Sequence, residues 1–310
     1  MWAFCVMGAM ISICIPIYNR DMRDTVAALA AQMRTAAVPC ELVCIDDHSE
    51  AAIAETNKVV EAVGHYIVLP ENVGRARIRN LFRQNARYEY LLFLDCDSVI
   101  PEGFLQRYAD FLGRETRHMV VCGGREYAAE SDDREHHLRY VYGVKCESRN
   151  AHQRRKHPYR SFMTNNFIVH RDVLKAIPFD ERISLYGHED TLFGYRLMQQ
   201  HIPITHVDNP VVNGDVESND LFLAKTEEGV QSLAEIYRWM GQERGFAEQV
   251  ALLRCYRLLH RFKVDGFIYA LYRLVRPWLK EGFVSGKRVN MKLFAFYKLG
   301  LLTENLRNSK

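Results

Sequence analysis

The stretch YLLFLDCDSVIP, at residues 90–101, decides the fold class. Its first five residues, Tyr90–Leu94, are apolar or aromatic, which is typical of a strand buried on both faces of a sheet. Asp95 and Asp97 follow this run directly. The stretch therefore predicts a central strand whose carboxyl end carries two carboxylates.

The residues before this strand alternate between strand-like and helix-like segments. Three further buried strands and three helices are expected, in chain order, at Ser12–Tyr18, Asp24–Met33, Glu41–Ile45, Ile53–Val63, His65–Leu69 and Gly74–Gln84. This alternation predicts an α/β fold with a mainly parallel central sheet covered by helices on both faces. Ligands of such sheets bind beyond the carboxyl ends of the strands. Because Asp46 and Asp47 also end a strand, both acidic pairs are expected at one ligand-binding edge.

The pattern changes after residue 119. Short strands are expected at Met119–Cys122 and Phe167–His170, and a polar, basic excursion at residues 131–158 separates them. Helices are then expected at Asp190–Gln200, Leu221–Trp239, Glu248–Leu279 and Met291–Leu302. We therefore expect an α/β domain at residues 10–240, followed by a basic helical C-terminal region at residues 241–310.

Each acidic pair has a structural and a chemical interpretation. Asp95 and Asp97 would repel each other if both were ionised, and a divalent cation such as Mn²⁺ or Mg²⁺ would remove that repulsion. The same residues could instead cap a turn. Asp47 could accept a hydrogen bond from a nucleobase N–H, or it could cap the following helix. The position of both pairs at the ends of buried strands favours a ligand site.

Four segments in order carry a resemblance to a known family. SICIPIYNR at residues 12–20, ELVCIDDHSE at 41–50, ENVGRARIRN at 71–80 and YLLFLDCDSVIP at 90–101 together resemble glycosyltransferase family 2, whose members have the GT-A fold. The resemblance covers roughly residues 10–105, and a weaker match continues to about residue 220. It implies an enzyme that moves a sugar from a nucleotide-sugar donor to an acceptor saccharide.

The resemblance also implies where the donor binds. Asp47 would accept from uracil N3–H, which favours a UDP-sugar, and Asp97 would hold the metal that bridges the diphosphate. Asp95 would face the ribose or the sugar. The other expected donor-binding residues are Pro16, Tyr18, Gly74, Arg79 and Asn80.

The segment YGHEDTLFGYRL, at residues 186–197, contains the expected catalytic pair. Acids in the first turn of a helix also interact favourably with the helix dipole, so a purely structural interpretation exists. In the family, the carboxylate at the position of Asp190 is the base of inverting enzymes, and Glu189 would hold the acceptor. Gly187 leaves room for a sugar. Asn165 and Asn166 could hold sugar hydroxyls or form an ordinary turn.

The metal site departs from the family pattern at one position. Related sequences often have a histidine after the helix that carries the base, where this chain has Asn213. Its side-chain oxygen is a weaker ligand than an imidazole. His206, seven residues earlier, is the alternative ligand.

Charge is distributed unevenly along the chain. Residues 242–310 carry 14 Lys and Arg against 5 Asp and Glu, whereas the preceding 241 residues carry 27 against 33. Apolar and aromatic residues are interleaved with the basic ones. The C-terminal region is therefore expected either to pack as a bundle with a solvated basic face or, the interpretation we favour, to attach to an anionic membrane. Nucleic acid is not an expected partner, because the body is acidic and no binding motif is present.

The cysteines and the first ten residues indicate in which cellular compartment the protein is expected. None of the eight cysteines forms a C-x-x-C pair, and several lie in strand-like runs, which favours free thiols in a reducing compartment. The apolar residues 1–10 are too short to span a bilayer and are expected to be an extension before a start at Met10. We expect a cytoplasmic protein, with peripheral attachment to the inner face of the membrane and an acceptor that is a saccharide, free or lipid-linked.

Two other classes of protein remain as alternatives. A nucleotidyltransferase would also combine an α/β sheet with metal-binding carboxylates, but it usually has a glycine-rich loop after the first strand, and PIYNRDMRD at residues 16–24 has no glycine. A non-catalytic sugar-binding protein on the same fold is supported by Asn213. The presence of Asp97 and Asp190 argues against it.

Overall fold

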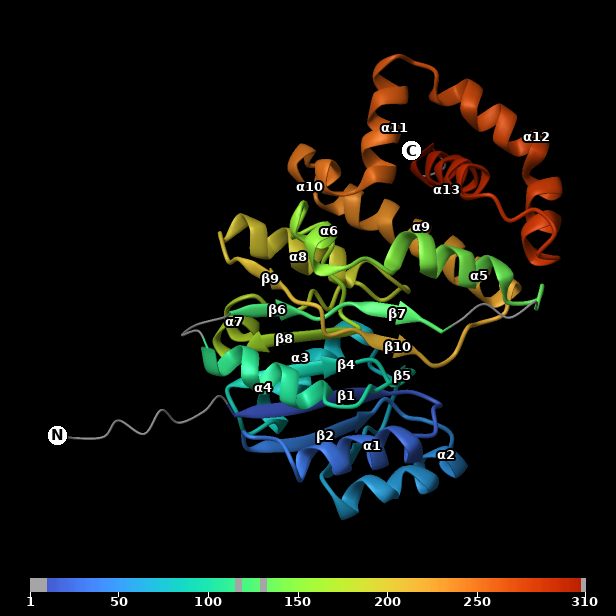
Figure 1. Ribbon diagram of the computed structural model, residues 1–310. Helices are drawn as coiled ribbons and strands as arrows, with labels where there is room; N and C mark the ends of the chain where they lie inside the picture. The colour runs from blue at the N-terminus through green and yellow to red at the C-terminus, as the bar shows by residue number, and fades with distance from the viewer. Residues whose placement is uncertain (1–9, 115–118, 129–132, 308–310) are drawn as a thin grey trace.

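The computed structural model describes residues 10–114, 119–128 and 133–307, so the expected extension before Met10 lies outside the described residues. A seven-stranded sheet forms the centre of the molecule, in the order β3-β2-β1-β4-β8-β6-β9 (Figure 1). Its strands are β1 Ile11–Ile17, β2 Cys40–Asp46, β3 His65–Val68, β4 Tyr90–Leu94, β6 Val120–Cys122, β8 Asn166–His170 and β9 Ile204–His206. The four strands expected before residue 95 are confirmed within one residue at each end.

The sheet is mixed and mostly parallel. Strands β3, β2, β1 and β4 are parallel to one another, whereas β8 runs antiparallel to both of its neighbours, β4 and β6. Strand β9 is parallel to β6. The parallel strands end at one edge, as expected, and the antiparallel strand β8 begins there, with Asn166 opposite Leu94.

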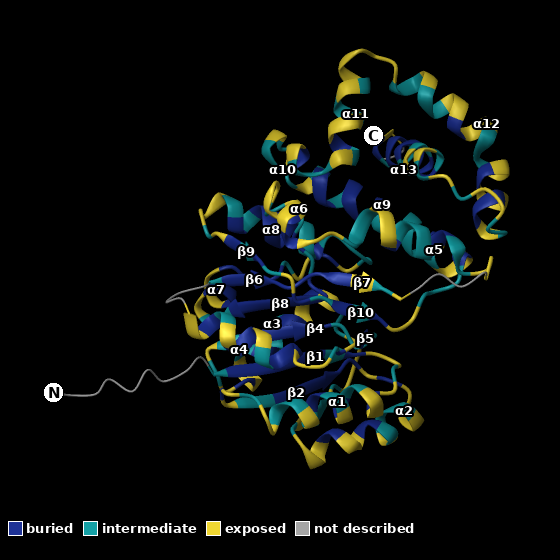
Figure 2. Ribbon diagram, in the orientation of Figure 1, coloured by how far each residue is buried: buried dark blue, intermediate teal, exposed yellow. Residues whose placement is uncertain are grey.

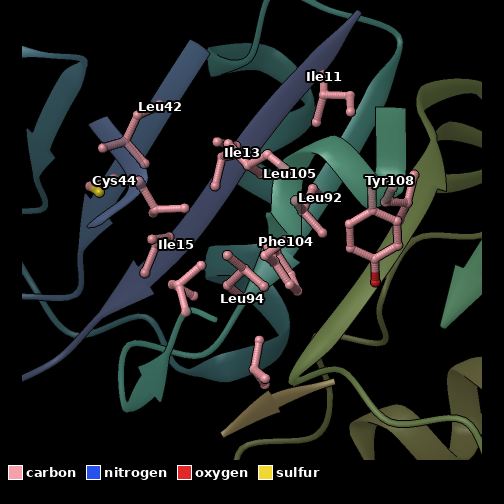
Figure 3. Packing of buried hydrophobic residues seen from close by; sticks show 14 of the residues in the cluster. Ile11, Ile13, Ile15, Leu42, Cys44, Leu92, Leu94, Phe104, Leu105 and Tyr108 are labelled. Carbon is pink, nitrogen blue, oxygen red and sulfur yellow. The ribbon is translucent and has the colours of Figure 1, made fainter. Parts of the chain in front are cut away.

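Side chains of the central strands alternate between two cores. Ile13 and Ile15 of β1, with Leu92 of β4, pack on one face of the sheet against helices α1 (Arg23–Met33) and α4 (Phe104–Arg114) (Figure 3). On the other face, alternate residues of the same strands pack against α3 (Arg75–Asn85), α7 (Arg171–Ala176) and α8 (Glu189–Gln199). Both faces of the sheet are therefore covered, which explains why its strands read as continuous apolar runs.

A second, three-stranded sheet lies beside the ends of the central strands. It contains β5 (Ser98–Val99), β10 (Val211–Asn213) and β7 (Arg125–Tyr127), in that order. The sequence analysis did not predict these strands, because segments of two or three residues are too short to show periodicity. This sheet links the residues after Asp97 to two distant segments of the chain.

The remaining helices occupy the segments between strands and the C-terminal third. Helix α2 (Ala51–Thr56) continues into a 3₁₀ turn at Asn57–Ala62, and the basic excursion contains α5 (His137–Tyr142), a π turn at Gly143–Glu147 and α6 (Ala151–Arg155). The C-terminal helices are α9 (Asn219–Trp239), α10 (Arg244–Gln249), α11 (Ala251–Arg261), α12 (Asp265–Val284) and α13 (Met291–Arg307).

The expectation of one helix over Glu248–Leu279 is wrong. Lys263, in the left-handed conformation with φ 57°, ends α11 and turns the chain into α12. The Val264 amide donates to the Leu259 carbonyl at 3.0 Å, which closes the helix end. No glycine or proline marks this turn, so the usual stop signals of a helix are missing from the sequence.

A third hydrophobic core holds the C-terminal helices together. Tyr272 of α12 and Tyr297 of α13 are fully buried in it, and Leu233 and Ile236 of α9 belong to the same cluster. Helix α9 thus shares one core with the helices that follow it, and the division at residue 240 stays a prediction. Figure 2 shows the buried strands of the sheet and the largely exposed outer side of α12. Across the three described segments, no helix is long and apolar enough to cross a bilayer.

Candidate active site

Asp47, at the end of β2, holds the start of α3. Its two carboxylate oxygens accept hydrogen bonds from the amides of Val73, at 2.7 Å, and Gly74, at 3.0 Å. Gly74 precedes α3 with φ 81°, a conformation that favours glycine. Burial raises the pKa of Asp47. The expected contact between Asp47 and a nucleobase stays a prediction.

Two more of the expected base-binding residues lie on the neighbouring strand. Pro16 is half-buried in β1, paired with Ile45 of β2. Tyr18 follows the last residue of β1 with more than half of its surface (54%) exposed. An exposed ring beside the buried Asp47 is suited to stack on a planar base.

Arg79, on α3, brings the two acidic segments together. Its guanidinium lies 3.2 Å from Asp95 Oδ1 and 3.3 Å from Glu189 Oε1. Arg79 and Glu189 are both buried, and Arg75 adds a second contact to Glu189 Oε1, at 3.4 Å. A carboxylate at a strand end and a carboxylate at a helix start, 94 residues apart in sequence, thus share one buried cation.

Arg125, the first residue of β7, lies across the acidic pair after β4. Its Nη2 is 3.3 Å from Asp97 Oδ1 and 3.5 Å from Asp95 Oδ2. Burial acts to raise the pKa of Asp95, but the nearby cations Arg79, Arg75 and Arg125 outweigh it and lower that pKa. For Asp97, burial raises the pKa despite Arg125.

The sequence analysis missed Arg125. It lies in a three-residue strand after the glycines at 123–124, and no periodicity or motif marks it. A network of ion pairs continues from it, since Arg125 Nη1 is 3.8 Å from Glu147 and Glu147 also pairs with Arg139 at 3.2 Å. Only the tertiary structure brings these residues to Asp97.

Asn213, rather than His206, lies beside Asp97. In the small sheet Asn213 pairs with Ser98, and the Gly214 amide donates to the Asp97 carbonyl at 2.9 Å. Asn213 Nδ2 donates to the Asp215 carbonyl, whereas its buried Oδ1 has no hydrogen-bond partner among the described residues. A carbonyl oxygen of this kind, next to a carboxylate, suits a hard divalent cation.

His206 is held by other partners. Its Nδ1 accepts from Arg154 Nε at 3.2 Å and its Nε2 faces the Pro158 carbonyl at 3.0 Å. Burial lowers the pKa of this fully buried ring to about 4. Neither ring nitrogen is left for a metal. Residues 10–114, 119–128 and 133–307 also contain no cluster of three His, Cys, Asp or Glu side chains that could hold a metal.

The amide of Asn80 forms hydrogen bonds within the fold. Its Nδ2 donates to the Phe179 carbonyl at 2.9 Å and to Glu181 Oε1 at 2.8 Å, and its Oδ1 accepts from the Phe179 amide at 2.9 Å. The expectation that Asn80 lines the donor pocket stays a prediction. Asn80 fastens the segment after α7 onto α3.

The two expected acceptor-binding asparagines differ. Asn166 is fully buried in β8, where its Oδ1 accepts from the Tyr108 hydroxyl and its Nδ2 donates to the Gly124 and Asn209 carbonyls. These bonds use its amide within the fold, and its expected contact with the acceptor stays a prediction. Asn165 is also buried, but its side-chain oxygen and nitrogen have no partner in the described part of the chain. Its carbonyl accepts from the Asp95 amide at 3.2 Å, next to the acidic pair.

The catalytic pair expected at the start of α8 is held by an unusual turn. Gly187 and His188 both have positive φ, 86° and 68°, and the Gly187 carbonyl accepts from Ser232 Oγ at 3.0 Å. Asp190 Oδ1 accepts from the Thr191 amide at 2.6 Å. Burial, assisted by the neighbouring charge of Glu189, raises the pKa of Asp190 to about 6.

The arrangement defines the class of protein. A mostly parallel sheet ends in an acidic pair, and a helix that begins with two acids closes the same site, which is the GT-A arrangement of glycosyltransferases. The family model described as Glycosyl transferase family 2 matches residues 12–177, more than half of the chain. The chain therefore belongs to glycosyl transferase family 2, a family of enzymes that transfer a sugar from a nucleotide-sugar donor.

Curated relatives and solved structures agree with this assignment. The chain is 26% identical over 221 residues to the chondroitin synthase of Pasteurella multocida (strain Pm70), and 26% identical over 226 residues to that of Escherichia coli. These matches cover 60% and 61% of this chain, but only 23% and 32% of the two synthases. A mannosyltransferase of Pyrobaculum calidifontis, solved with GDP-Man and Mn²⁺, has the same fold, with a TM-score of 0.56 at 12% identity over 97% of this chain and 88% of the other.

Proposed function

We propose that this enzyme is a metal-dependent, inverting glycosyltransferase that moves a sugar from a UDP-sugar to the hydroxyl of an acceptor saccharide. One observation carries the proposal. Arg79 contacts both Asp95, at 3.2 Å, and Glu189, at 3.3 Å, so the donor-side carboxylates and the expected catalytic pair belong to one buried site. If the two acidic segments only capped local structure, they would not need to contact the same buried cation.

The donor binds at the carboxyl ends of β1, β2 and β4. Tyr18 stacks on the base. Asp47 accepts a hydrogen bond from the N3–H of the base, through carboxylate lone pairs that the amides of Val73 and Gly74 leave open. Gly74 lets the backbone approach the donor closely, since a Cβ at this position would meet open space rather than protein. Asp95 and Arg79 face the ribose and the sugar.

The side-chain oxygens of Asp97 and Asn213 fit a divalent cation, Mn²⁺ or Mg²⁺. Asp97 provides a carboxylate that is one-third exposed, and the buried Asn213 Oδ1 next to it has no partner within the described ranges. A cation held there would stabilise the charge that develops on the leaving diphosphate. The mannosyltransferase that shares the fold was solved with Mn²⁺, which supports the choice of metal.

Asp190 acts as the general base. A half-buried carboxylate with a pKa of about 6 is ionised at neutral pH, yet it holds a proton more readily than an ordinary aspartate. The Thr191 amide fixes one of its oxygens and leaves the other for the acceptor hydroxyl. Glu189 orients the acceptor, Gly187 leaves it space, and Asn165 hydrogen-bonds its hydroxyls.

The acceptor is a growing polysaccharide or a lipid-linked saccharide. The two relatives named as chondroitin synthases support polymer assembly, although this chain matches less than a third of either protein. Which sugar is transferred would follow from the groups that face the donor sugar, above all Asp95 and Arg79.

The C-terminal region attaches the enzyme to an anionic membrane surface. Six large apolar side chains of α11 and α12, which we call the apolar face, are between 39% and 78% exposed: Leu258, Phe262, Phe267, Leu271, Leu274 and Trp278. The last four follow a helical spacing, so they line one side of α12. Exposed cations accompany them, and Arg288 lies over the Trp278 ring at 4.6 Å. An apolar face surrounded by cations suits a bilayer with anionic lipids.

A screen of nucleotide-sugars for slow hydrolysis, with and without Mn²⁺, tests the catalytic proposal without an acceptor. We expect one UDP-sugar to be hydrolysed, and the hydrolysis to need the metal. Asp97→Asn should abolish it, whereas Asp110→Asn, an exposed aspartate on α4, should leave it unchanged. Metal-independent hydrolysis, or hydrolysis of a GDP-sugar alone, would contradict the proposal.

A further inference from the structure

A cleft lined by arginines lies between α10, α11 and the turn that follows α9. Its volume is about 780 Å³, and its lining includes five guanidinium groups and the ring of a tyrosine: Arg160, Arg244, Arg254, Arg257, Arg261 and Tyr256. Glu248 is the only acidic residue in the described lining. A cavity of this size with such an excess of positive charge is suited to an anionic ligand larger than a single ion.

Helix α11 presents most of these charges on one side. Arg254, Arg257 and Arg261 are spaced at i, i+3 and i+7, and Leu258 lies on the same side. Like charges at this spacing repel one another, so the helix would be more stable without them unless a ligand compensates. The repulsion indicates a binding role rather than a structural one.

The acids and carbonyls around the cleft neutralise only part of this charge. Glu248 accepts from Arg244 Nε at 2.7 Å through its carboxylate and from Arg254 Nη1 at 3.1 Å through its carbonyl. Arg160 Nε contacts the uncharged Gln249 side chain at 3.3 Å. Arg257 and Arg261 form no salt bridge to any acid of the described chain. At least two guanidinium groups are therefore available for a ligand.

The cleft is separate from the active site. Helix α8 begins with the catalytic pair, and further along it Tyr195 donates to Glu243 Oε1 at 2.5 Å, just before the cleft-lining Arg244. The body of α8 thus lies between Asp190 and the cleft. In Figure 1, α10 and α11 lie on the opposite side of α8 and α9 from the edge where β4 and β5 meet.

We propose that this cleft binds the phosphate group of a lipid headgroup. The lining contains five arginines and no lysine, and the planar fork of an arginine matches phosphate oxygens through paired hydrogen bonds. Leu258 lines the cleft and also belongs to the apolar face, so a phosphate in the cleft can continue into acyl chains on that face. The assignment of the ligand as a lipid rests on the membrane attachment proposed above. The binding of a phosphate group in the cleft does not depend on that proposal.

Calorimetry of the full chain with a water-soluble, short-chain phosphatidic acid tests the site, in EDTA so that the metal site does not contribute. The triple variant Arg254→Gln/Arg257→Gln/Arg261→Gln should bind at least about tenfold more weakly, since hydrogen bonds to charged groups are lost. The matched control Arg273→Gln/Lys280→Gln/Lys287→Gln removes three exposed cations from α12 and the turn after it, and should bind within about twofold of the parent. Equal losses in the two triple variants, or no binding by the parent, would overturn the proposal.

Two further measurements complete the test. The single variant Arg257→Gln should weaken binding of the lipid severalfold. It tests the site even if the triple variant does not fold. Inorganic phosphate should bind the parent much more weakly than the short-chain lipid, and Leu258→Asn should reduce that difference. If inorganic phosphate binds as tightly as the lipid, the lipid assignment is wrong. Because both probes are soluble, a failure of vesicle attachment or of sugar transfer would not affect this result.

Discussion

Arg125 Nη2 lies 3.3 Å from Asp97 Oδ1, in the position where a metal-binding carboxylate would need its cation. The guanidinium also reaches Asp95, at 3.5 Å, so it neutralises both members of the acidic pair when no metal is bound. If Asp97 binds the proposed metal, a residue that stabilises the metal-free pair competes with that metal. On this proposal, Arg125 lowers the affinity of the site for the cation.

Replacing Arg125 tests this competition. Arg125→Met should strengthen the binding of Mn²⁺ alone by roughly threefold to tenfold, because Asp97 then loses the cation that contacts it and its repulsion with Asp95 grows. Titration of Mn²⁺ followed by calorimetry gives the affinity. The control Arg182→Gln removes an exposed arginine that pairs with Asp180 and should leave the affinity unchanged. Unchanged or weaker binding in Arg125→Met would contradict the account.

Arg79 should stabilise the folded enzyme as well as hold Asp95 and Glu189 together in the site. Arg79→Met leaves Glu189 and Asp95 without their shared buried cation, and breaking such a pair costs about 3 kcal/mol or more in the free energy of unfolding. Denaturant unfolding measures this loss. Adding Glu189→Gln to Arg79→Met should recover part of it, because one unpaired charge is then removed. Strict additivity of the two losses would show that the residues do not interact.

Asn213 can be exchanged for the ligand that related sequences carry. Asn213→His should bind Mn²⁺ more tightly than the parent, because imidazole is a better ligand for this metal than a neutral amide oxygen. Asn213→Ala should bind it more weakly. Because the side chain is buried, thermal unfolding of both variants is needed as a control. Equal Mn²⁺ affinity in all three proteins would show that position 213 does not contact the metal.

The apolar face should govern attachment to vesicles. Phe267→Ser/Leu274→Ser removes two of its most exposed side chains, 71% and 78% exposed, and should reduce sedimentation with anionic vesicles at high salt, where charge is screened. The control Val59→Ser/Val63→Ser, on the opposite part of the molecule around α2, changes two other exposed apolar residues. Parent protein that stays in the supernatant at low salt would refute the membrane proposal.

The central sheet could be predicted because its strands are buried on both faces. Runs such as Tyr90–Leu94 need no alternation to be recognised, and their acidic ends mark the ligand edge. The strand expected at Phe167–His170 is confirmed as β8, but its antiparallel direction, like the short strands β5, β7 and β10, depends on pairing between distant segments, which no local pattern shows. The turn at Lys263 was missed for a related reason, since a lysine in the left-handed conformation has no sequence signal.

The site was predictable in part. Carboxylates at strand and helix ends are visible in sequence, and the structure brings Asp95 and Glu189 onto one arginine. Amides were less predictable, because an asparagine that binds a ligand looks like one that fastens a loop. Asn80 and Asn166 proved to use their hydrogen bonds within the fold, whereas Asn165 does not. Arg125 could only be found from the tertiary structure.

The pH dependence of transfer measures the role of Asp190 most directly. Because burial raises its pKa to about 6, the base is protonated and inactive below that pH and ionised above it. The turnover number of the parent should therefore fall as the pH drops through about 6, and donor binding should persist. Asp190→Asn should lower turnover at neutral pH by at least about a hundredfold, with UDP affinity nearly unchanged.

The decisive experiment is the turnover number of the parent and of Asp190→Asn, measured between about pH 5 and about pH 8 with saturating donor and acceptor. The account predicts an acidic limb with an apparent pKa of about 6 in the parent, and a slow, flat profile in the variant. A variant that transfers sugar at close to the parent rate, or that keeps the same acidic limb, would contradict the assignment of Asp190 as the base.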